Sequence, residues 1–281
     1  MIHSERKSIL CPNCRRLISS YENRCPYCGI ANPASPWKRG LLTNMLRDPF
    51  DMIQIIIYVN VALYIFALLL DISSLGMSMN PLVFLSPSNK SLFFLGATGT
   101  IPILQQHWWW TLVSASYLHG GLLHIFFNMM ALRQLGPFVI HQYGVNRFFV
   151  IYTVTGIAGF FISFIAGIPF TIGASASICG LIGATLYYGK SRGGTFGQAV
   201  YRQVMGWVIG LALFGFLVPG INNWGHGGGI AAGILMGFLL GYTERHAESN
   251  HHRVLAIACV ILTVIVLAWA ILQSVYYVFL R

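Results

Sequence analysis

The chain has 281 residues, of which 56% are hydrophobic and 9% are charged, and its mean hydropathy is +0.68. These values exclude an ordinary soluble globular domain and indicate a membrane protein. The net charge of +10 would suit a nucleic-acid partner, but most of the basic residues fall where membrane orientation alone requires them, so we expect no nucleic-acid binding.

The first predicted element is a small cysteine-rich module over residues 1–31. Its four cysteines have the spacing C-x2-C-x10-C-x2-C, which suits a tetrahedral zinc ion: Cys11, Cys14, Cys25 and Cys28. A redox dithiol, an iron–sulfur cluster and two disulfides are the alternatives, and a reducing cytoplasm disfavours the disulfides. We therefore expect a cytoplasmic zinc-ribbon-like module whose folding depends on a structural zinc ion. A cytoplasmic partner that binds this module is a further expectation. Residues 32–50, rich in proline and basic residues, are expected to be a linker.

Seven apolar runs follow, and crossing a hydrocarbon core of about 30 Å takes about 20 helical residues. They cover residues 52–70, 120–140, 148–167, 173–189, 201–218, 225–242 and 254–280. The second run contains Arg133, and the fourth is short and rich in Gly and Ala, so both depend partly on their neighbours. The predicted fold class is an all-α polytopic membrane protein.

Basic residues are distributed unevenly around these runs. Fifteen of the 17 Lys and Arg precede the first run or lie in turns on the same side, and only Lys90 and Arg281 lie on the other. The positive-inside rule then places the N-terminus in the cytoplasm and the C-terminus outside. We expect an integral multi-pass protein of the cell membrane.

The second, fourth and sixth runs therefore share one direction, from outside to inside, and each begins with polar residues. His124 and Asn128 lie one turn apart in the second run, Ser175 begins the fourth, and His226 begins the sixth. At a rise of about 1.5 Å per residue, each lies within about 10 Å of its helix start. Ionisable residues at membrane depth usually face a protein interior or a water-filled cavity, so a shared depth predicts a shared site.

These four residue types are chemically complementary. A serine hydroxyl is a weak nucleophile without a base, and His226 could accept the proton of Ser175. His124, Asn128 and the backbone N–H of Ser175 could stabilise an oxyanion. No Asp or Glu stands at the same depth, so we expect a Ser–His dyad without a carboxylate and no cofactor for catalysis. For each residue alone, a hydrogen bond between helices is the alternative explanation.

Small residues predict close helix packing in the same runs. In the sixth run, glycines repeat every four residues, at Gly225, Gly229, Gly233, Gly237 and Gly241. Such stripes let transmembrane helices approach closely, which would bring His226 towards Ser175. Ser177 lies about 200° around the helix from Ser175, so it should point to another face.

Three segments in this order, LHGGLLHIFFNMMAL, GASASICGLIGA and NWGHGGGIAAG, resemble the rhomboid family of intramembrane serine proteases. The resemblance implies a six-helix rhomboid-like catalytic core over residues 51–243, with a loop and an extra C-terminal transmembrane helix over residues 244–281. It implies cleavage of membrane proteins with helix-destabilising segments, near the outer face of the bilayer. Carried over by position, the resemblance implies Ser175 as the nucleophile and His226 as the general base. It implies that His124 and Asn128 support the oxyanion, and that His119 and Gly173 have secondary roles.

Residues 71–118 match the family's long, partly membrane-embedded loop, and three positions depart from the family pattern. Ala176 replaces a glycine next to the nucleophile. Thr111 stands where an arginine is usual, so the loop must be anchored differently. Cys179 replaces an aromatic residue that packs on the catalytic histidine, which predicts sensitivity to thiol reagents.

Two other functions remain open at this stage. A rhomboid-like pseudoprotease would bind membrane clients without cutting them, but loss of the Ser or His usually marks that class, and both are present. A transporter would use its intramembrane polar residues to bind substrate, but clustering at one end without an acidic relay counts against it. The seventh run is expected to be structural, with docking of other membrane proteins as the alternative.

Overall fold

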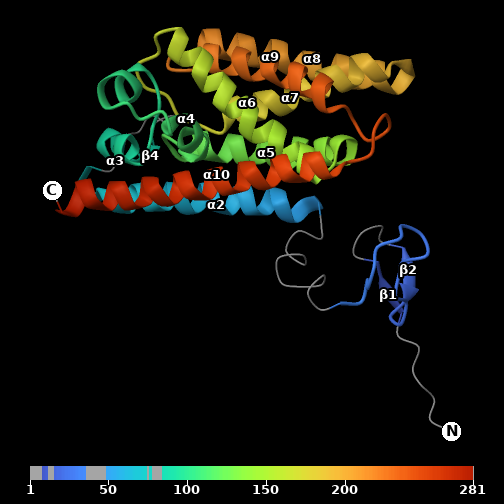
Figure 1. Ribbon diagram of the computed structural model, residues 1–281. Coiled ribbons are helices and arrows are strands. Elements are labelled where there is room, and N and C mark those ends of the chain that lie inside the picture. Colours follow the sequence, from blue (N-terminus) through green and yellow to red (C-terminus); the bar gives the residue numbers. More distant parts are fainter. Residues whose placement is uncertain (1–7, 12–15, 36–48, 75, 78–83, 281) are drawn as a thin grey trace. The chain divides into compact units, whose positions relative to one another are not determined.

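The computed structural model describes residues 8–11, 16–35, 49–74, 76–77 and 84–280 (Figure 1). The chain divides into two compact units, Met1–Met52 and Ile53–Arg281. Most of the predicted linker lies outside the described residues, and the predicted subdivision at residues 31, 50 and 243 stays a prediction.

The described part of the first unit is built on a short hairpin. Strands β1 (Ser8–Leu10) and β2 (Leu17–Ser19) are antiparallel, with Ile9 opposite Ile18. Ile18 is buried with Cys11 and Cys25, and Ile9, Cys28 and Ile30 pack partly buried against them. So small an apolar cluster buries too little surface to hold a fold by itself, which makes the cysteines the main candidates for stabilising it.

The described residues from Pro49 onward form seven long helices, one at each predicted apolar run. They are α2 (Pro49–Leu70), α5 (Leu122–Tyr143), α6 (Val145–Ile165), α7 (Ser175–Arg192), α8 (Gly194–Leu217), α9 (Asn223–Leu240) and α10 (Asn250–Val275). Within the described part of the chain, five are long and apolar enough to cross a membrane, namely α2, α5, α6, α8 and α10. The predicted fold class, an all-α polytopic membrane protein, is confirmed.

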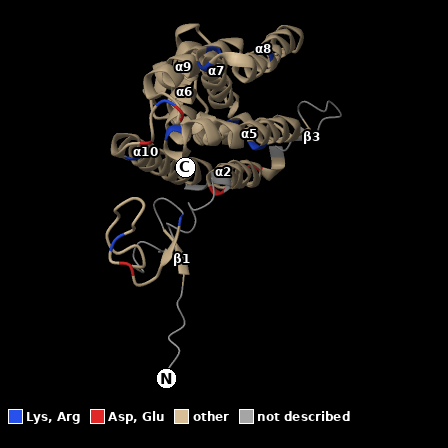
Figure 2. Cartoon of the chain, turned by 90° about the vertical axis from the view of Figure 1, so that its right-hand side faces the viewer, with Lys and Arg blue, Asp and Glu red and all other residues tan. Residues whose placement is uncertain are grey.

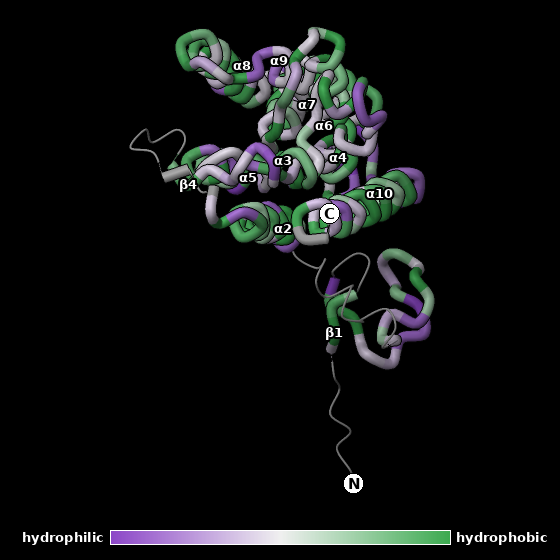
Figure 3. Tube along the Cα trace, turned by 90° about the vertical axis from the view of Figure 1, so that its left-hand side faces the viewer, coloured by the Kyte–Doolittle hydropathy of each residue, from purple (hydrophilic) through white to green (hydrophobic). Residues whose placement is uncertain are grey.

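The two helices that fall short in hydropathy, α7 and α9, pack against each other, and α9 buries its glycine face while residues such as Phe238 and Leu239 on it stay exposed. α7 also contacts α5, α6 and α8, so most of its surface is covered by protein. The peripheral helices α2, α8 and α10 are largely apolar (Figure 3), and charged residues are sparse along the helices (Figure 2). Phe216 and Leu217 on α8 are 82% and 80% exposed, which suits contact with lipid tails rather than water.

Glycines bring α9 onto α7, as the four-residue repeat predicts. Gly225, Gly229, Gly233 and Gly237 are all buried. A Cβ atom at Gly229 would overlap the carbonyl oxygen of Ala176, and one at Gly233 would overlap that of Gly180, so only glycine allows this approach. Gly241 is different: α9 ends at Leu240, and Gly241 caps it with a φ of +65°. The repeat therefore extends over four packing positions, and the fifth serves to end the helix.

Residues 71–118, called loop 71–118 below, form a chain of short elements between α2 and α5. Those described are the 3-10 turns η2 (Ile72–Ser74) and η5 (Ala115–Tyr117), strands β3 (Gly76–Met77) and β4 (Phe84–Ser86), helices α3 (Asn89–Phe94) and α4 (Thr111–Ser114), and the π-helix η4 (Ile101–Gln105). The loop is tied to the segment before α7 by a two-way backbone bridge. The N–H of Thr98 donates to the carbonyl of Thr171 at 3.0 Å, and the reverse bond measures 2.7 Å.

The segment between α9 and α10 is fixed by a buried arginine at the start of α6. Arg147 is 0% exposed, and its guanidinium donates to the carbonyls of His246 and Ala247 at 2.8 and 2.9 Å. The carboxylate of Glu248 accepts the backbone N–H groups of Asn146 and Arg147 at 2.9 and 3.1 Å. A buried guanidinium is tolerated where carbonyls and a carboxylate surround it, so this cluster gives α10 a defined starting point.

Candidate active site

Ser175 and His226 lie within hydrogen-bonding distance of each other. Ser175 is the first residue of α7, and His226 lies in the first turn of α9. The Oγ atom of Ser175 is 2.9 Å from Nε2 of His226. Both residues are half-buried. The glycine contacts between the two helices produce this approach, because a larger residue at Gly229 would push α9 away from Ala176.

The other ring nitrogen of His226, Nδ1, is buried and has no hydrogen-bond partner among the described residues. If Nε2 accepts the proton of Ser175, Nδ1 must carry the ring hydrogen. The geometry pairs Ser175 with His226, and a catalytic dyad without a carboxylate stays a prediction.

His124 lies on the other side of Ser175. Its Nδ1 accepts the backbone N–H of Gly120 at 3.3 Å, so in the neutral ring the hydrogen sits on Nε2. Gly173 has a φ of +127° and leaves a space where a side chain would otherwise stand. That space lies 2.7 Å from Nε2 of His124 and 3.5 Å from Oγ of Ser175. An N–H donor and a hydroxyl therefore flank one atom-sized position.

Asn128 and His119 complete the predicted set. The side-chain amide of Asn128 donates to the carbonyl of His124 at 2.8 Å, which occupies one of its two N–H groups. The ring of His119 packs edge-on against that of His124, with centroids 5.0 Å apart. His119 lies before α5 and is fully buried, and neither of its ring nitrogens has a hydrogen-bond partner among the described residues.

The three departures from the family pattern have clear structural settings. Ala176 is buried in an apolar cluster with Leu112 and Ala115 of loop 71–118. Thr111 joins two parts of that loop: its hydroxyl donates to the carbonyl of Trp108, and its Oγ1 lies 3.0 Å from Oγ1 of Thr98. Cys179 is 2% exposed and faces Gly229, so a thiol reagent reaches it only if α7 and α9 separate. The expected thiol sensitivity stays a prediction.

Ser177 points away from this site. Its Oγ lies 3.5 Å from that of Ser116 in loop 71–118, on another face of α7. The two serines of GASASICG thus differ in surroundings, as their angular separation predicts.

Sequence reasoning missed Asn222, which joins three elements at the start of α9. Its Oδ1 caps the helix by accepting the N–H of Gly225 at 2.9 Å. Its Nδ2 donates to Oγ of Ser163 on α6 and to Oγ1 of Thr171 before α7, both at 2.8 Å. An asparagine before a helix signals an N-cap, but the two lateral bonds depend on residues more than 50 positions away.

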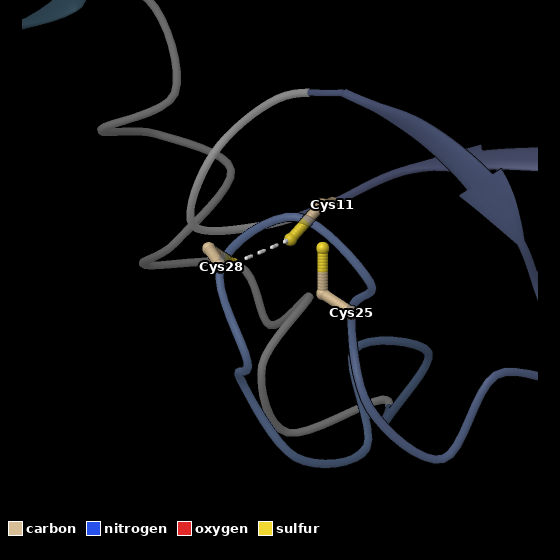
Figure 4. A group of neighbouring side chains, drawn as sticks. All are labelled: Cys11, Cys25 and Cys28. Carbon is tan, nitrogen blue, oxygen red and sulfur yellow. Dashed lines mark hydrogen bonds between the residues drawn. The ribbon is translucent and has the colours of Figure 1, made fainter.

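Three of the four predicted metal ligands lie together in the first unit (Figure 4). The sulfur atoms of Cys11, Cys25 and Cys28 are all within 4.8 Å of one another, and those of Cys11 and Cys28 are 3.6 Å apart. A disulfide would require about 2.05 Å. In a tetrahedral site with zinc–sulfur bonds of about 2.3 Å, two sulfur atoms lie about 3.8 Å apart. The observed sulfur–sulfur spacing therefore fits thiolates around one ion. Cys14 lies outside the described residues.

The fold and the site together define an integral membrane protein whose packed helices bring a serine against a histidine. The sequence also matches the Rhomboid domain over residues 106–243. Rhomboid protease GluP of Bacillus subtilis (strain 168) is 35% identical over 150 residues, which are 53% of this chain and 29% of that protein. RHOMBOID-like protein 5 of Arabidopsis thaliana is 30% identical over 218 residues, which are 71% of this chain and 67% of that protein.

The chain belongs to the rhomboid family. Its match spans 29% to 41% of the length of three similar relatives, GluP and the Arabidopsis RHOMBOID-like proteins 1 and 4. Inactive RHOMBOID-like protein 8 of Arabidopsis thaliana is also similar, at 35% identity over 113 residues, which are 40% of this chain and 31% of that protein. Family membership thus includes both a protease and an inactive relative.

Proposed function

We propose that this protein is an intramembrane serine endopeptidase that uses Ser175 and His226 as a catalytic dyad. The observation that carries the proposal is the 2.9 Å contact between Oγ of Ser175 and Nε2 of His226. A serine hydroxyl this close to an imidazole can transfer its proton as it attacks a carbonyl carbon. Similarity to a rhomboid protease supports the same reaction.

In the proposed reaction, Oγ of Ser175 attacks the substrate carbonyl while Nε2 of His226 takes the hydroxyl proton. The protonated His226 then gives that proton to the leaving amine, which leaves an acyl group on Ser175. Water hydrolyses this ester with His226 again acting as base, and the serine is regenerated. No metal or other cofactor enters these steps.

The tetrahedral intermediate needs donors for its negative oxygen, and the space above Gly173 is our candidate position. Nε2–H of His124 points there, and the backbone N–H of Ser175 lies at the positive end of α7. We assign Asn128 a supporting role through its bond to the carbonyl of His124, and through its second amide hydrogen, which that bond leaves available. His119 is assigned to packing, and Gly173 to keeping the position open.

Substrates are proposed to be membrane proteins with helix-destabilising segments, cut near the outer face of the bilayer. An intact helix hides its peptide bonds, so local unwinding must precede attack. The charge distribution supports a cytoplasmic N-terminus and an outside C-terminus in the cell membrane, and seven membrane helices would place the two ends on opposite sides.

The test uses purified protein in liposomes with a single-span substrate. We expect cleavage by the wild type and by Ser177→Ala, and none by Ser175→Ala or His226→Ala. Ser177→Ala is the matched control because it removes a hydroxyl from the same helix two residues away. Cleavage by Ser175→Ala at the wild-type rate would disprove the assignment.

An inactive client-binding role is the competing proposal, and similarity to an inactive relative supports it. Under that alternative, the wild type would bind the single-span protein in liposomes without cutting it. The presence of both Ser175 and His226 in contact favours the protease.

We further propose that Cys11, Cys14, Cys25 and Cys28 hold one structural zinc ion, and that the folded module recruits a cytoplasmic partner. The 3.6 Å spacing of two thiols and the small apolar core support metal-dependent folding. Purified wild type should contain about one zinc per chain, and Cys11→Ser combined with Cys25→Ser should contain background zinc. Cys259→Ser on α10 is the control, and zinc loss in that variant, or retention in the double variant, would contradict the site.

A further inference from the structure

We propose that the C-terminal helix positions the nucleophile, because Tyr277 at its end clamps loop 71–118 onto the segment that leads to Ser175. Helix α10 continues into a π-helix, η6 (Tyr276–Leu280), whose wider turn carries Tyr277. This inference rests on the proposed protease activity and assigns Tyr277 a positioning role within it.

The clamp is a group of aromatic rings. The ring of Tyr277 stacks on Phe94 at the end of α3, with centroids 4.8 Å apart and planes 7° apart. It also lies 6.5 Å from the ring of Trp108. Trp108 in turn packs against Phe93 at 5.1 Å and Trp110 at 5.8 Å. One ring from α10 therefore contacts two separate parts of loop 71–118, before and after its π-helix.

The same loop is bonded directly to the residues before α7. The backbone N–H of Gly173 donates to the carbonyl of Ala115 at 2.9 Å, two residues before Ser175. The bridge between Thr98 and Thr171 adds a second connection. Ala115 also shares an apolar cluster with Ala176, on the other side of Ser175. Movement of loop 71–118 would therefore move the backbone on both sides of the nucleophile.

The other end of α10 is fixed as well. The Arg147 cluster holds residues 246–248 against the start of α6, and the body of α10 packs along α6, α4 and α3. In Figure 1, α10 runs beside α2 along the bundle, and its C-terminal end lies near α3. A helix fixed at its start can restrain a loop at its end, which a free terminal helix could not do.

The experiment compares Tyr277→Ala with Trp269→Ala, an aromatic residue on α10 that is 53% exposed. Amide hydrogen exchange over residues 93–117 reports on the clamp without requiring any proteolysis. Cleavage of the single-span substrate reports on the site. We expect Tyr277→Ala to raise exchange in this loop about tenfold and to lower kcat by a similar factor, with KM nearly unchanged.

Two further variants keep the test decisive. Tyr277→Phe retains the stacking ring and should bring both loop exchange and kcat closer to wild-type values than Tyr277→Leu, which retains only apolar bulk. Unchanged loop exchange in Tyr277→Ala and Tyr277→Leu, or equal effects of Trp269→Ala, would overturn the proposal. If the wild type cuts nothing, the protease proposal fails, while the exchange data still decide whether Tyr277 holds the loop.

Discussion

The replacement Gly173→Ala tests the position assigned to the oxyanion. It adds one carbon atom to the space between His124 and Ser175 and removes no proposed catalytic group. The new Cβ would lie 2.7 Å from Nε2 and 2.9 Å from Cε1 of the His124 ring. Ordinary van der Waals contact begins at 3.4 Å, so either the ring or the backbone must move by about 0.7 Å.

Two separable penalties follow from this geometry. The φ of +127° is strained for alanine, which costs about 1–3 kcal/mol of stability. Misplacing a catalytic donor by about 1 Å lowers the rate about 100-fold, and losing an oxyanion donor costs about 2.7–4 kcal/mol in the transition state. We therefore expect kcat to fall about 100-fold or more.

Gly167→Ala separates the two penalties. Gly167 has a φ of +80°, and a Cβ there would meet nothing within 4 Å. The Gly167→Ala variant should lower the unfolding midpoint about as much as Gly173→Ala does, as measured by circular dichroism in detergent. It should nevertheless cleave the single-span substrate at nearly the wild-type rate. Cleavage by folded Gly173→Ala within threefold of wild type would refute the assigned position, because the added carbon would then occupy a site that the reaction does not use.

Two more comparisons use matched positions on α9. Gly233→Ala forces a Cβ onto the backbone of Gly180 and should destabilise the bundle by about 1–3 kcal/mol, whereas Gly227→Ala has open space and should be neutral or slightly stabilising in denaturant titrations. Equal shifts would contradict the glycine contact between α7 and α9. Asn222→Ser keeps a capping oxygen but is too short for the bonds to α6 and to the segment before α7, so we expect kcat to fall about tenfold with little loss of stability. Asn223→Ser, which removes a bond to α8, should leave kcat nearly unchanged, and a similar loss in both variants would contradict the positioning role of Asn222.

The helices and the meeting of Ser175 with His226 could be predicted from local patterns. Apolar length alone located seven helices, because the bilayer sets the length that each must have. Charge gave α5, α7 and α9 a common predicted direction, which placed their polar first turns at a common depth. Glycines at every fourth residue then predicted how α9 approaches α7. Each of these signals lies within one helix or beside it.

The connections between elements could not be predicted in the same way. Thr98 pairs with Thr171, which is 73 positions further along the chain. Tyr277 stacks on Phe94, which is 183 positions before it. Neither pair has a spacing or residue pattern that marks it. At Gly241 a pattern is present but misleads: the residue fits the four-residue repeat, yet it caps α9 instead of packing on α7. Helix ends and close packing positions both favour glycine, so the sequence alone does not distinguish them.

The low hydropathy of α7 and α9 follows from the properties that make a site possible. Glycines that allow close approach contribute little apolar surface, and Ser175 and His226 add polar atoms, so these helices are poorly suited to lipid on all sides. α7 is suited to the interior that α5, α6, α8 and α9 help to enclose, whereas α9 turns its glycine face to α6 and α7 and keeps apolar residues such as Phe238 and Leu239 exposed. Ser175 and His226 meet where α7 and α9 pack against each other, so formation of the site depends on the packing of the bundle around α7. On that reasoning, substitutions that loosen the bundle far from Ser175 should reduce activity through the fraction of molecules that contain an assembled pair.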